Sequence, residues 1–174
     1  RGPNNREYYG FVKKNVGAFF VLNTQAYYST SPAVLARADS QLAEMDSFFT
    51  ANASVPNKFV CSHVPLFINA QNEDSTGYFS IGPTYRKRII ALMNKHNARH
   101  YLAGHRHENA VKTDGSITMY TNTALSFQLG TGNQRGYYIY TVTSGSVKRD
   151  FYPLSLEPDV VRWKWIAYGD TRTN

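Results

Sequence analysis

The chain has 174 residues, of which 42% are hydrophobic and 18% are charged, and its formal net charge is +7. This size and apolar content favour one soluble globular domain with a buried core. No run of about 18 apolar residues occurs and no leader resembles a signal peptide, so no membrane span is expected. The positive charge could attract phosphates or nucleic acid. Because the basic residues are mostly scattered, we expect no specific nucleic-acid partner.

The two ends of the chain suggest a fragment, and the single cysteine limits disulfide formation. It begins with Arg1 rather than methionine and stops shortly after an apolar run, so we expect a fragment that lacks its N-terminal targeting region. Cys61 is the only cysteine and lies within an apolar run, which rules out an intrachain disulfide and indicates a buried thiol. The sequence indicates neither the compartment nor the oligomeric state.

The first half of the chain alternates strand and helix patterns. Two aromatic and β-branched runs predict an antiparallel pair of strands, YYGFVKKN and VGAFFVLN. Apolar residues then recur every three or four positions and predict a helix from Ser31 and Pro32 to about Asn52. A short buried strand, NKFVCSH, and a long polar loop, FINAQNEDSTGYFSIG, follow. Pro83 is expected to open a second helix with one face formed by Tyr85, Ile89, Leu92 and His96.

The second half changes to sheet alone. The run RHYLAGH predicts another short buried strand. The segment NAVKTDGSITMYTN predicts a hairpin with an Asp-Gly turn, and a second hairpin is expected where SGS separates GYYIYTVT from VKRDFYPL. The alternation followed by hairpins indicates the α/β fold class.

Three of the five histidines follow short buried strands. His63 comes after NKFVCS, and His105 and His107 come after RHYLAG. Ligand sites in open α/β sheets collect at the carboxyl ends of strands, so the two loops are expected to meet. Gly104 would permit a tight turn before the pair, and residues two apart in an extended segment point to the same side. His105 and His107 are therefore expected to face one site.

Neutral imidazole is the commonest metal ligand near neutral pH, so these three histidines suggest a zinc, iron or manganese site. The alternative is that His63 is an ordinary hydrogen-bonded residue and that the H-x-H pair holds no metal. Spacing alone leaves both interpretations open. The two other histidines are expected to be surface or cap residues, because His96 lies late in a helix and His100 lies before a strand.

Two of these segments resemble a known family. AGHRHENA resembles the G-H-x-H motif of calcineurin-like metallophosphoesterases, and VCSHVPLF resembles the strand-end histidine, followed by proline and an apolar pair, of the same family. The segments VLNTQAYY, DSQLAEMDSFF and TALSFQLG resemble its single-domain branch, which includes protein-phosphatase-like members. The resemblance runs from about Tyr8 to Leu156. It implies a two-sheet sandwich in α-β-β-α layers, of which residues 1–157 would be the C-terminal part.

The resemblance also implies a chemistry. The complete domain would hydrolyse a phosphate-ester substrate with two divalent or trivalent metal ions (Mn, Fe or Zn). His63 and His105 would bind one metal ion, and His107 would bind the other. Two metals about 3.5 to 4 Å apart can hold a bridging hydroxide as nucleophile and neutralise the phosphoryl oxygens. The family's D-x-H, G-D-x-x-D and G-N-H-D or G-N-H-E motifs do not precede Tyr8. We therefore expect the chain alone to be inactive and to bind at most one metal, weakly.

The last segment, VVRWKWIAYGDTRTN, resembles the opening strand and first G-D motif of another metallophosphoesterase domain. On this interpretation residues 158–174 are the first strand of a following phosphoesterase domain, and Asp170 is a tentative metal ligand. A rearranged domain, with its N-terminal half placed behind its C-terminal half, would look the same. The other interpretation is a last edge strand of the same domain, with Asp170 in an N-cap-like position.

Two rival functions also fit the sequence. One is a non-catalytic binding domain with a basic surface and at most one histidine-bound metal. The other is a mononuclear zinc hydrolase that uses the three histidines as they stand. Further catalytic residues, substrate-binding residues and the identity of the phosphate ester are not indicated, because loops set the pocket shape in this family.

Overall fold

The structure is a computed structural model that describes residues 5–74, 77–126, 128–129 and 134–154. Asp170 and the strand predicted at residues 158–174 lie outside the described residues, as does the junction predicted near residue 157. No helix within the described ranges combines the length and the apolar character needed to cross a bilayer.

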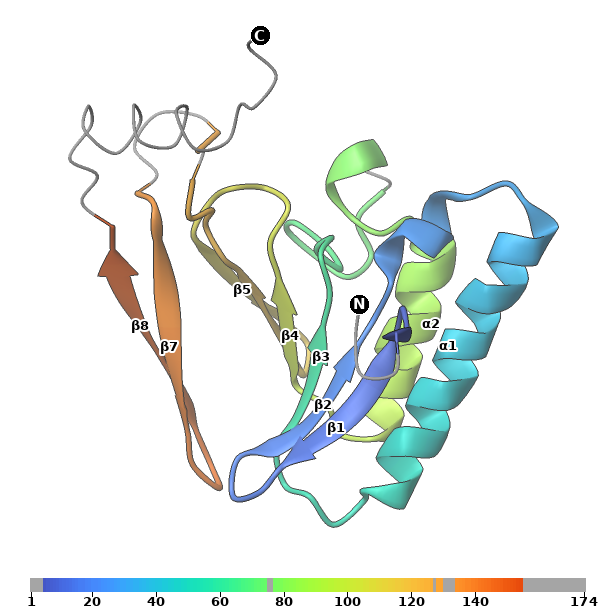
Figure 1. The fold of residues 1–174 in the computed structure, drawn as a ribbon, viewed down its shortest axis with the longest axis horizontal. Helices are drawn as coiled ribbons and strands as arrows, with labels where there is room; N and C mark the ends of the chain where they lie inside the picture. Colours follow the sequence, from blue (N-terminus) through green and yellow to red (C-terminus); the bar gives the residue numbers. More distant parts are fainter. Residues whose placement is uncertain (1–4, 75–76, 127, 130–133, 155–174) are drawn as a thin grey trace, which may run out of the picture.

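A six-stranded mixed sheet forms the middle of the fold (Figure 1). Its four central strands run parallel to one another, whereas each edge strand is antiparallel to its neighbour. This arrangement confirms the two predicted strand pairs and the two short buried strands. In spatial order the strands are β1 (Tyr9–Lys13), β2 (Gly17–Val21), β3 (Lys58–Cys61), β4 (His100–Ala103), β6 (Ile117–Thr121) and β5 (Ala110–Asp114).

Two helices cover one face of this sheet (Figure 1). Both α1 (Pro32–Ala51) and α2 (Pro83–Lys95) begin at a proline, which suits the first turn of a helix because the N–H groups there have no acceptor within the helix and proline has no N–H. Short 3₁₀ helices occur at η2 (Thr24–Tyr28) and η3 (Gly77–Phe79). The core lies between the helices and the sheet, and its largest apolar side chains include Phe20, Phe49, Phe67 and Tyr101.

The buried face of α2 differs from the predicted face. The fully buried residues are Arg86, Ile89 and Met93, whereas Tyr85 and Leu92 are only partly buried. The predicted and the observed buried faces share Ile89, so the observed face is rotated around the helix axis by about one residue. The difference arises because Arg86 points inward, where its charge meets backbone carbonyl groups that no helical periodicity could show.

A second sheet lies against the other face of the first (Figure 1). It is a hairpin of two strands, β7 (Gly136–Val142) and β8 (Val147–Pro153), as the sequence predicted. Tyr140 connects the sheets, because its hydroxyl donates to Asn122 Oδ1 at 2.7 Å and its ring meets Tyr120 edge-on at 5.6 Å. The mixed α/β architecture with two sheets expected for a metallophosphoesterase-like fold is confirmed, and the described residues supply its helix, sheet and sheet layers.

The expectation that His96 is a surface or cap residue is only half right. His96 is the C-cap of α2, but its side chain is 8% exposed and its Nε2 atom lies 2.5 Å from Asp46 Oδ1 on α1. Lys95 Nζ lies 2.7 Å from the same carboxylate oxygen. Hydrogen bonds from Lys95 and then from His96 lower the pKa of Asp46. This cluster therefore joins the two helices at their C-terminal halves.

We expect the variant Asp46→Asn to be less stable than the original chain, by roughly 0.2 to 1 kcal/mol because the pair is partly exposed. Since the folded-state pKa of Asp46 is lowered, its contribution is present above its unfolded pKa of about 4 and is lost as the pH falls through the lowered value. The difference between the urea midpoints of the two proteins should be larger at about pH 6 than at about pH 3. Lys87→Gln on α2 serves as a control with no expected change, and an equal Asp46→Asn difference at both pH values would contradict this explanation.

Candidate functional site

The carboxyl ends of β3 and β4 bring two of the predicted histidines into contact. These strands are parallel neighbours, so their ends lie at the same edge of the sheet. The Gly104 N–H donates to the His63 carbonyl at 3.0 Å and ties the two following loops together. His105 Nδ1 then lies 3.0 Å from His63 Nε2, with the rings nearly edge-on at 76°. The prediction that the two loops meet is confirmed.

The turn that carries the G-H-x-H motif differs from the predicted one. Gly104 was expected to supply the unusual backbone, but the left-handed conformations belong to His105 and His107, with φ values of 67° and 52°. The segment is therefore not extended, and the argument from alternating side chains does not apply to it. Its tight geometry is held by the Arg106 N–H, which donates to the Gly104 carbonyl at 2.7 Å. Left-handed residues with side chains cost about 1 to 2 kcal/mol each, and such strain gathers at functional sites.

His107 lies within electrostatic reach of the pair but is not part of it. Burial first, then the charges of His105 and His107, lower the pKa of His63, which favours its neutral, ligand-competent form. Within the described ranges, however, no group of three or more His, Cys, Asp or Glu side chains is arranged to hold a metal ion. The structure thus joins His63 and His105, and the three-histidine ligand set stays a prediction.

The contacts of His105 determine which of its nitrogens is available. Its Nε2 atom lies 2.9 Å from the backbone carbonyl of Tyr78, which can only accept a hydrogen bond. The neutral ring therefore carries its proton on Nε2 and keeps the lone pair on Nδ1, the atom that faces His63. Two imidazole nitrogens bound to one metal at about 2.0 to 2.1 Å are separated by about 2.8 to 3.0 Å at a right angle and by about 3.3 to 3.4 Å at the tetrahedral angle. The observed 3.0 Å separation fits a shared metal ion as two of its ligands.

Two aromatic side chains border the pair, and sequence reasoning missed them. Tyr78 is 70% exposed and Phe79 is 48% exposed, yet their ring centres lie 4.4 Å and 6.4 Å from that of His105. Both belong to the long loop that was predicted only as polar surface. The sequence carried one indication of this contact, namely two adjacent aromatic residues inside an otherwise polar segment. Such a pair is unusual in a surface loop unless its rings contact another part of the protein or a ligand.

A buried arginine holds this loop in place. Arg86 Nε donates to the Ile81 carbonyl at 3.0 Å, and its Nη1 atom donates to the Glu73 carbonyl at 2.5 Å. The Glu73 carboxylate in turn accepts three backbone N–H groups from residues 68–70, so both ends of the loop are fixed. Burial lowers the pKa of Arg86, although a guanidinium stays charged in proteins. Arg86 thereby anchors the carbonyls of Glu73 and Ile81, which lie on either side of Tyr78 in the sequence.

The neighbouring charged and sulfur groups are weaker candidates for metal ligands. Arg106, between the two histidines, lies with its Nε atom 2.8 Å from Glu108 Oε1, so its charge is already paired. Cys61 is half-buried rather than fully buried, and desolvation raises the pKa of its thiol to about 12. A protonated thiol is a poor metal ligand, so imidazoles are the strongest candidates at this end of the sheet.

Comparison with known proteins finds sequence similarity to a phosphatase and a similar fold among solved structures. No profile of a known protein family matches the chain. The chain is 27% identical over 149 residues to the human serine/threonine-protein phosphatase CPPED1, a match that covers 85% of this chain and 47% of that protein. The protein of the same name from Pongo abelii is 26% identical over the same shares. The chain thus spans about half the length of the curated relatives it matches.

Among solved structures, the fold is similar to that of GAP50, described as the anchor in the inner membrane complex of Plasmodium. The TM-score is 0.61 at 16% sequence identity, and the match covers 84% of this chain and 49% of that chain. Such low identity supports the fold alone. The chain is therefore similar in sequence to about half of a serine/threonine-protein phosphatase, and it shares a two-sheet α/β fold with a solved structure.

Proposed function

We propose that this chain is part of a metal-dependent hydrolase of phosphate esters, and that His63, His105 and His107 belong to its metal centre. The observation that carries the proposal is the 3.0 Å approach of His105 Nδ1 to His63 Nε2 at the ends of two adjacent parallel strands. The distant homology to a serine/threonine phosphatase supports a phosphate ester as the substrate class. In the complete domain two divalent or trivalent ions, Mn, Fe or Zn, would bind.

Each residue has a defined task in this proposal. The metal ions, when bound, supply the positive charge that stabilises the phosphoryl oxygens during displacement. His105 offers its Nδ1 lone pair, because the Tyr78 carbonyl holds the proton on Nε2. His63 offers Nε2, and its lowered pKa keeps the ring neutral toward lower pH. His107 belongs to the second ion, and the exposed rings of Tyr78 and Phe79 form an apolar wall beside His105.

The same proposal includes the domain boundaries of the chain. Residues 1–157 form the C-terminal part of a calcineurin-like phosphoesterase domain, and residues 158–174 begin a following one, with Asp170 as a tentative ligand. The described part contributes an imidazole pair rather than a complete ligand group. We therefore expect this chain to be catalytically inactive by itself and to need ligands from other parts of the protein.

A binding domain without catalysis is the second candidate. It is favoured by the lack of a three-ligand group within the described ranges and by the net charge of +7. In that case the histidine pair would hold at most one metal ion in a structural role, and the basic surface would recruit an anionic partner.

An assay of the full-length protein separates the two candidates. It should hydrolyse p-nitrophenyl phosphate and a phosphoserine peptide, lose activity in EDTA and regain activity with Mn²⁺. His105→Ala should lower kcat by more than about 100-fold, because losing a group that only orients a metal ligand already costs about 10 to 100-fold. The 174-residue chain should show no hydrolysis. Unchanged full-length activity after His105→Ala would refute the proposal, and hydrolysis by the 174-residue chain would refute its need for ligands from other parts of the protein.

A further inference from the structure

Two adjacent aromatic side chains are open to solvent beside the histidine pair. Tyr78 and Phe79, here called the aromatic pair, lie in η3 and are 70% and 48% exposed. Their rings meet edge-on, with centres 5.7 Å apart and planes at 77°. Single exposed apolar residues are ordinary on protein surfaces, whereas a group of them beside a candidate site points to a surface that a ligand covers.

The aromatic pair is exposed on a fixed frame rather than on a loose segment. The next two residues, Ser80 and Ile81, are fully buried. The Tyr28 hydroxyl donates to the Ser80 carbonyl at 3.0 Å, and the Ile81 N–H donates to the Pro65 carbonyl at 2.9 Å. The pair is therefore preorganised, and a ligand that covers it loses little free energy to ordering the loop.

The aromatic pair also contacts a proposed metal ligand. The ring centres of Tyr78 and Phe79 lie 4.4 Å and 6.4 Å from that of His105. The Tyr78 carbonyl accepts a hydrogen bond from His105 Nε2 at 2.9 Å, while Nδ1 faces His63. When the phosphate of an ester binds a metal ion at the histidine pair, the group bonded to the ester oxygen is the part of the substrate nearest to it. That group would lie within reach of the two rings.

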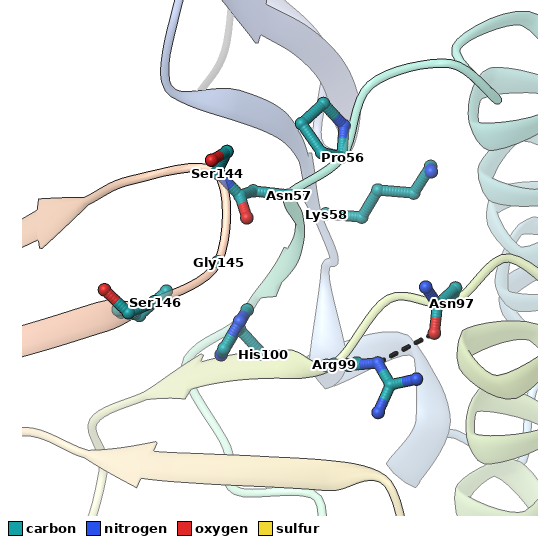
Figure 2. A pocket seen from close by; sticks show the side chains of 10 residues that line it. Pro56, Asn57, Lys58, Asn97, Arg99, His100, Ser144, Gly145 and Ser146 are labelled. Atoms are coloured by element: carbon teal, nitrogen blue, oxygen red, sulfur yellow. Dashed lines mark hydrogen bonds between the residues drawn. The ribbon is translucent and has the colours of Figure 1, made fainter.

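The cavity at the opposite end of the sheet differs from this site, because its basic groups do not converge. It has a volume of about 410 Å³, opens where β3 and β4 begin, and is lined by Lys58, Arg99 and His100 among others. Figure 2 shows Arg99 extending toward Asn97, to which its Nε atom donates at 2.8 Å, and Lys58 extending away from the turn between β7 and β8. The histidine end therefore offers the better-defined ligand surface.

The geometry of the aromatic pair favours an aromatic ligand over an aliphatic one. An aromatic ring has a negative face and a positive edge, so ring pairs prefer edge-to-face or offset contacts at about 4.5 to 7 Å. Because the two rings of the pair are nearly perpendicular, a third ring can pack on the face of one and meet the edge of the other. An aliphatic group gains only the burial of apolar area.

We propose that the aromatic pair selects phosphate monoesters that carry an aromatic ring at or next to the ester oxygen. This inference rests on the proposed function, because the metal centre at His63 and His105 would hold the phosphate. Phe79 is the residue to test, since its substitution leaves the contacts between Tyr78 and His105 in place.

The test compares benzyl phosphate with ethyl phosphate as substrates of the full-length protein in Mn²⁺. Both esters release a primary alcohol, so the ratio of their kcat/KM values reports recognition of the ring. The original protein should favour the benzyl ester by about tenfold or more. Phe79→Ala should reduce this ratio by about fivefold, through a higher KM for the benzyl ester. Benzylphosphonate, which is not hydrolysed, should bind Phe79→Ala about fivefold more weakly in calorimetry.

Further variants define the contact. Phe79→Tyr keeps a ring and should keep the ratio, whereas Phe79→Leu keeps the apolar character alone and should lose most of it. Phe11→Ala is the matched control, because it makes the same change at a ring that is 42% exposed on β1, two strands away from β3. It should leave the ratio unchanged.

Phosphotyrosine and a phosphotyrosine peptide distinguish the two sources of such a ring. Phe79→Ala should raise the KM for both, and the lower of the two KM values in the original protein identifies a small ester or a protein side chain as the better substrate.

The outcomes separate this inference from the proposed function. Equal effects of Phe79→Ala and Phe11→Ala, an unchanged ratio in Phe79→Leu, or unchanged benzylphosphonate affinity in Phe79→Ala would overturn the inference alone. Hydrolysis of neither ester by the full-length protein would overturn the proposed function and the inference with it.

Discussion

His105→Ala is expected to weaken Zn²⁺ or Co²⁺ binding by this chain by about 100-fold or more. The chain should bind one ion weakly, because the described ligand atoms are two imidazole nitrogens, His63 Nε2 and His105 Nδ1, 3.0 Å apart. Removing one of them leaves a single imidazole, which cannot chelate. His63→Ala should show a loss of similar size. Calorimetry and the visible spectrum of bound Co²⁺ both report the change.

Two variants make this result diagnostic. Because the His107 ring is not part of the pair, His107→Ala should lower the affinity of the isolated chain by less than about threefold. Cys61→Ser should have no effect, since the pKa of the thiol is raised to about 12 and it stays protonated. Tight stoichiometric zinc that is lost equally in all three histidine variants would contradict this arrangement and would favour a mononuclear zinc site.

Arg86→Met is expected to lower the free energy of unfolding by about 2 to 4 kcal/mol. The side chain is fully buried and donates to the carbonyls of Ile81, Glu73 and Asp74. Methionine fills similar space but leaves those carbonyls without their donor, and each unsatisfied buried group costs about 1 to 3 kcal/mol. Urea unfolding should show the loss, and limited proteolysis should cut the loop between β3 and α2 more rapidly.

Arg88→Met provides the comparison on the same helix. Arg88 is 46% exposed, and its ion pair with Asp39 faces solvent, so its loss should cost less than about 1 kcal/mol. Arg86→Lys should recover only part of the stability, because an ammonium cannot reproduce the planar fork of the guanidinium. Equal effects of the two methionine variants would show that Arg86 does not anchor the loop.

Local sequence patterns predicted most of the secondary structure, for reasons visible in particular elements. The Asp-Gly turn between β5 and β6 follows from Gly115, whose φ of 56° is readily reached by a residue without a side chain. Prolines at positions 32 and 83 begin both helices. The buried face of α2 was predicted one residue out of phase, because periodicity counts apolar residues and Arg86 is charged. Its carbonyl partners lie in an irregular loop that has no repeating pattern.

The candidate site likewise has some features that the sequence predicted and others that required the structure. The sequence by itself determined that His63 and His105 each follow a short buried strand, since such strands are marked by local apolar runs and their ends by polar residues. Only the tertiary structure decided that the two rings touch, that the Tyr78 carbonyl selects the free nitrogen of His105, and that a basic cavity forms at the other end of the sheet. These contacts join residues far apart in the chain. They depend on strand order and register, which the packing of the whole sheet sets.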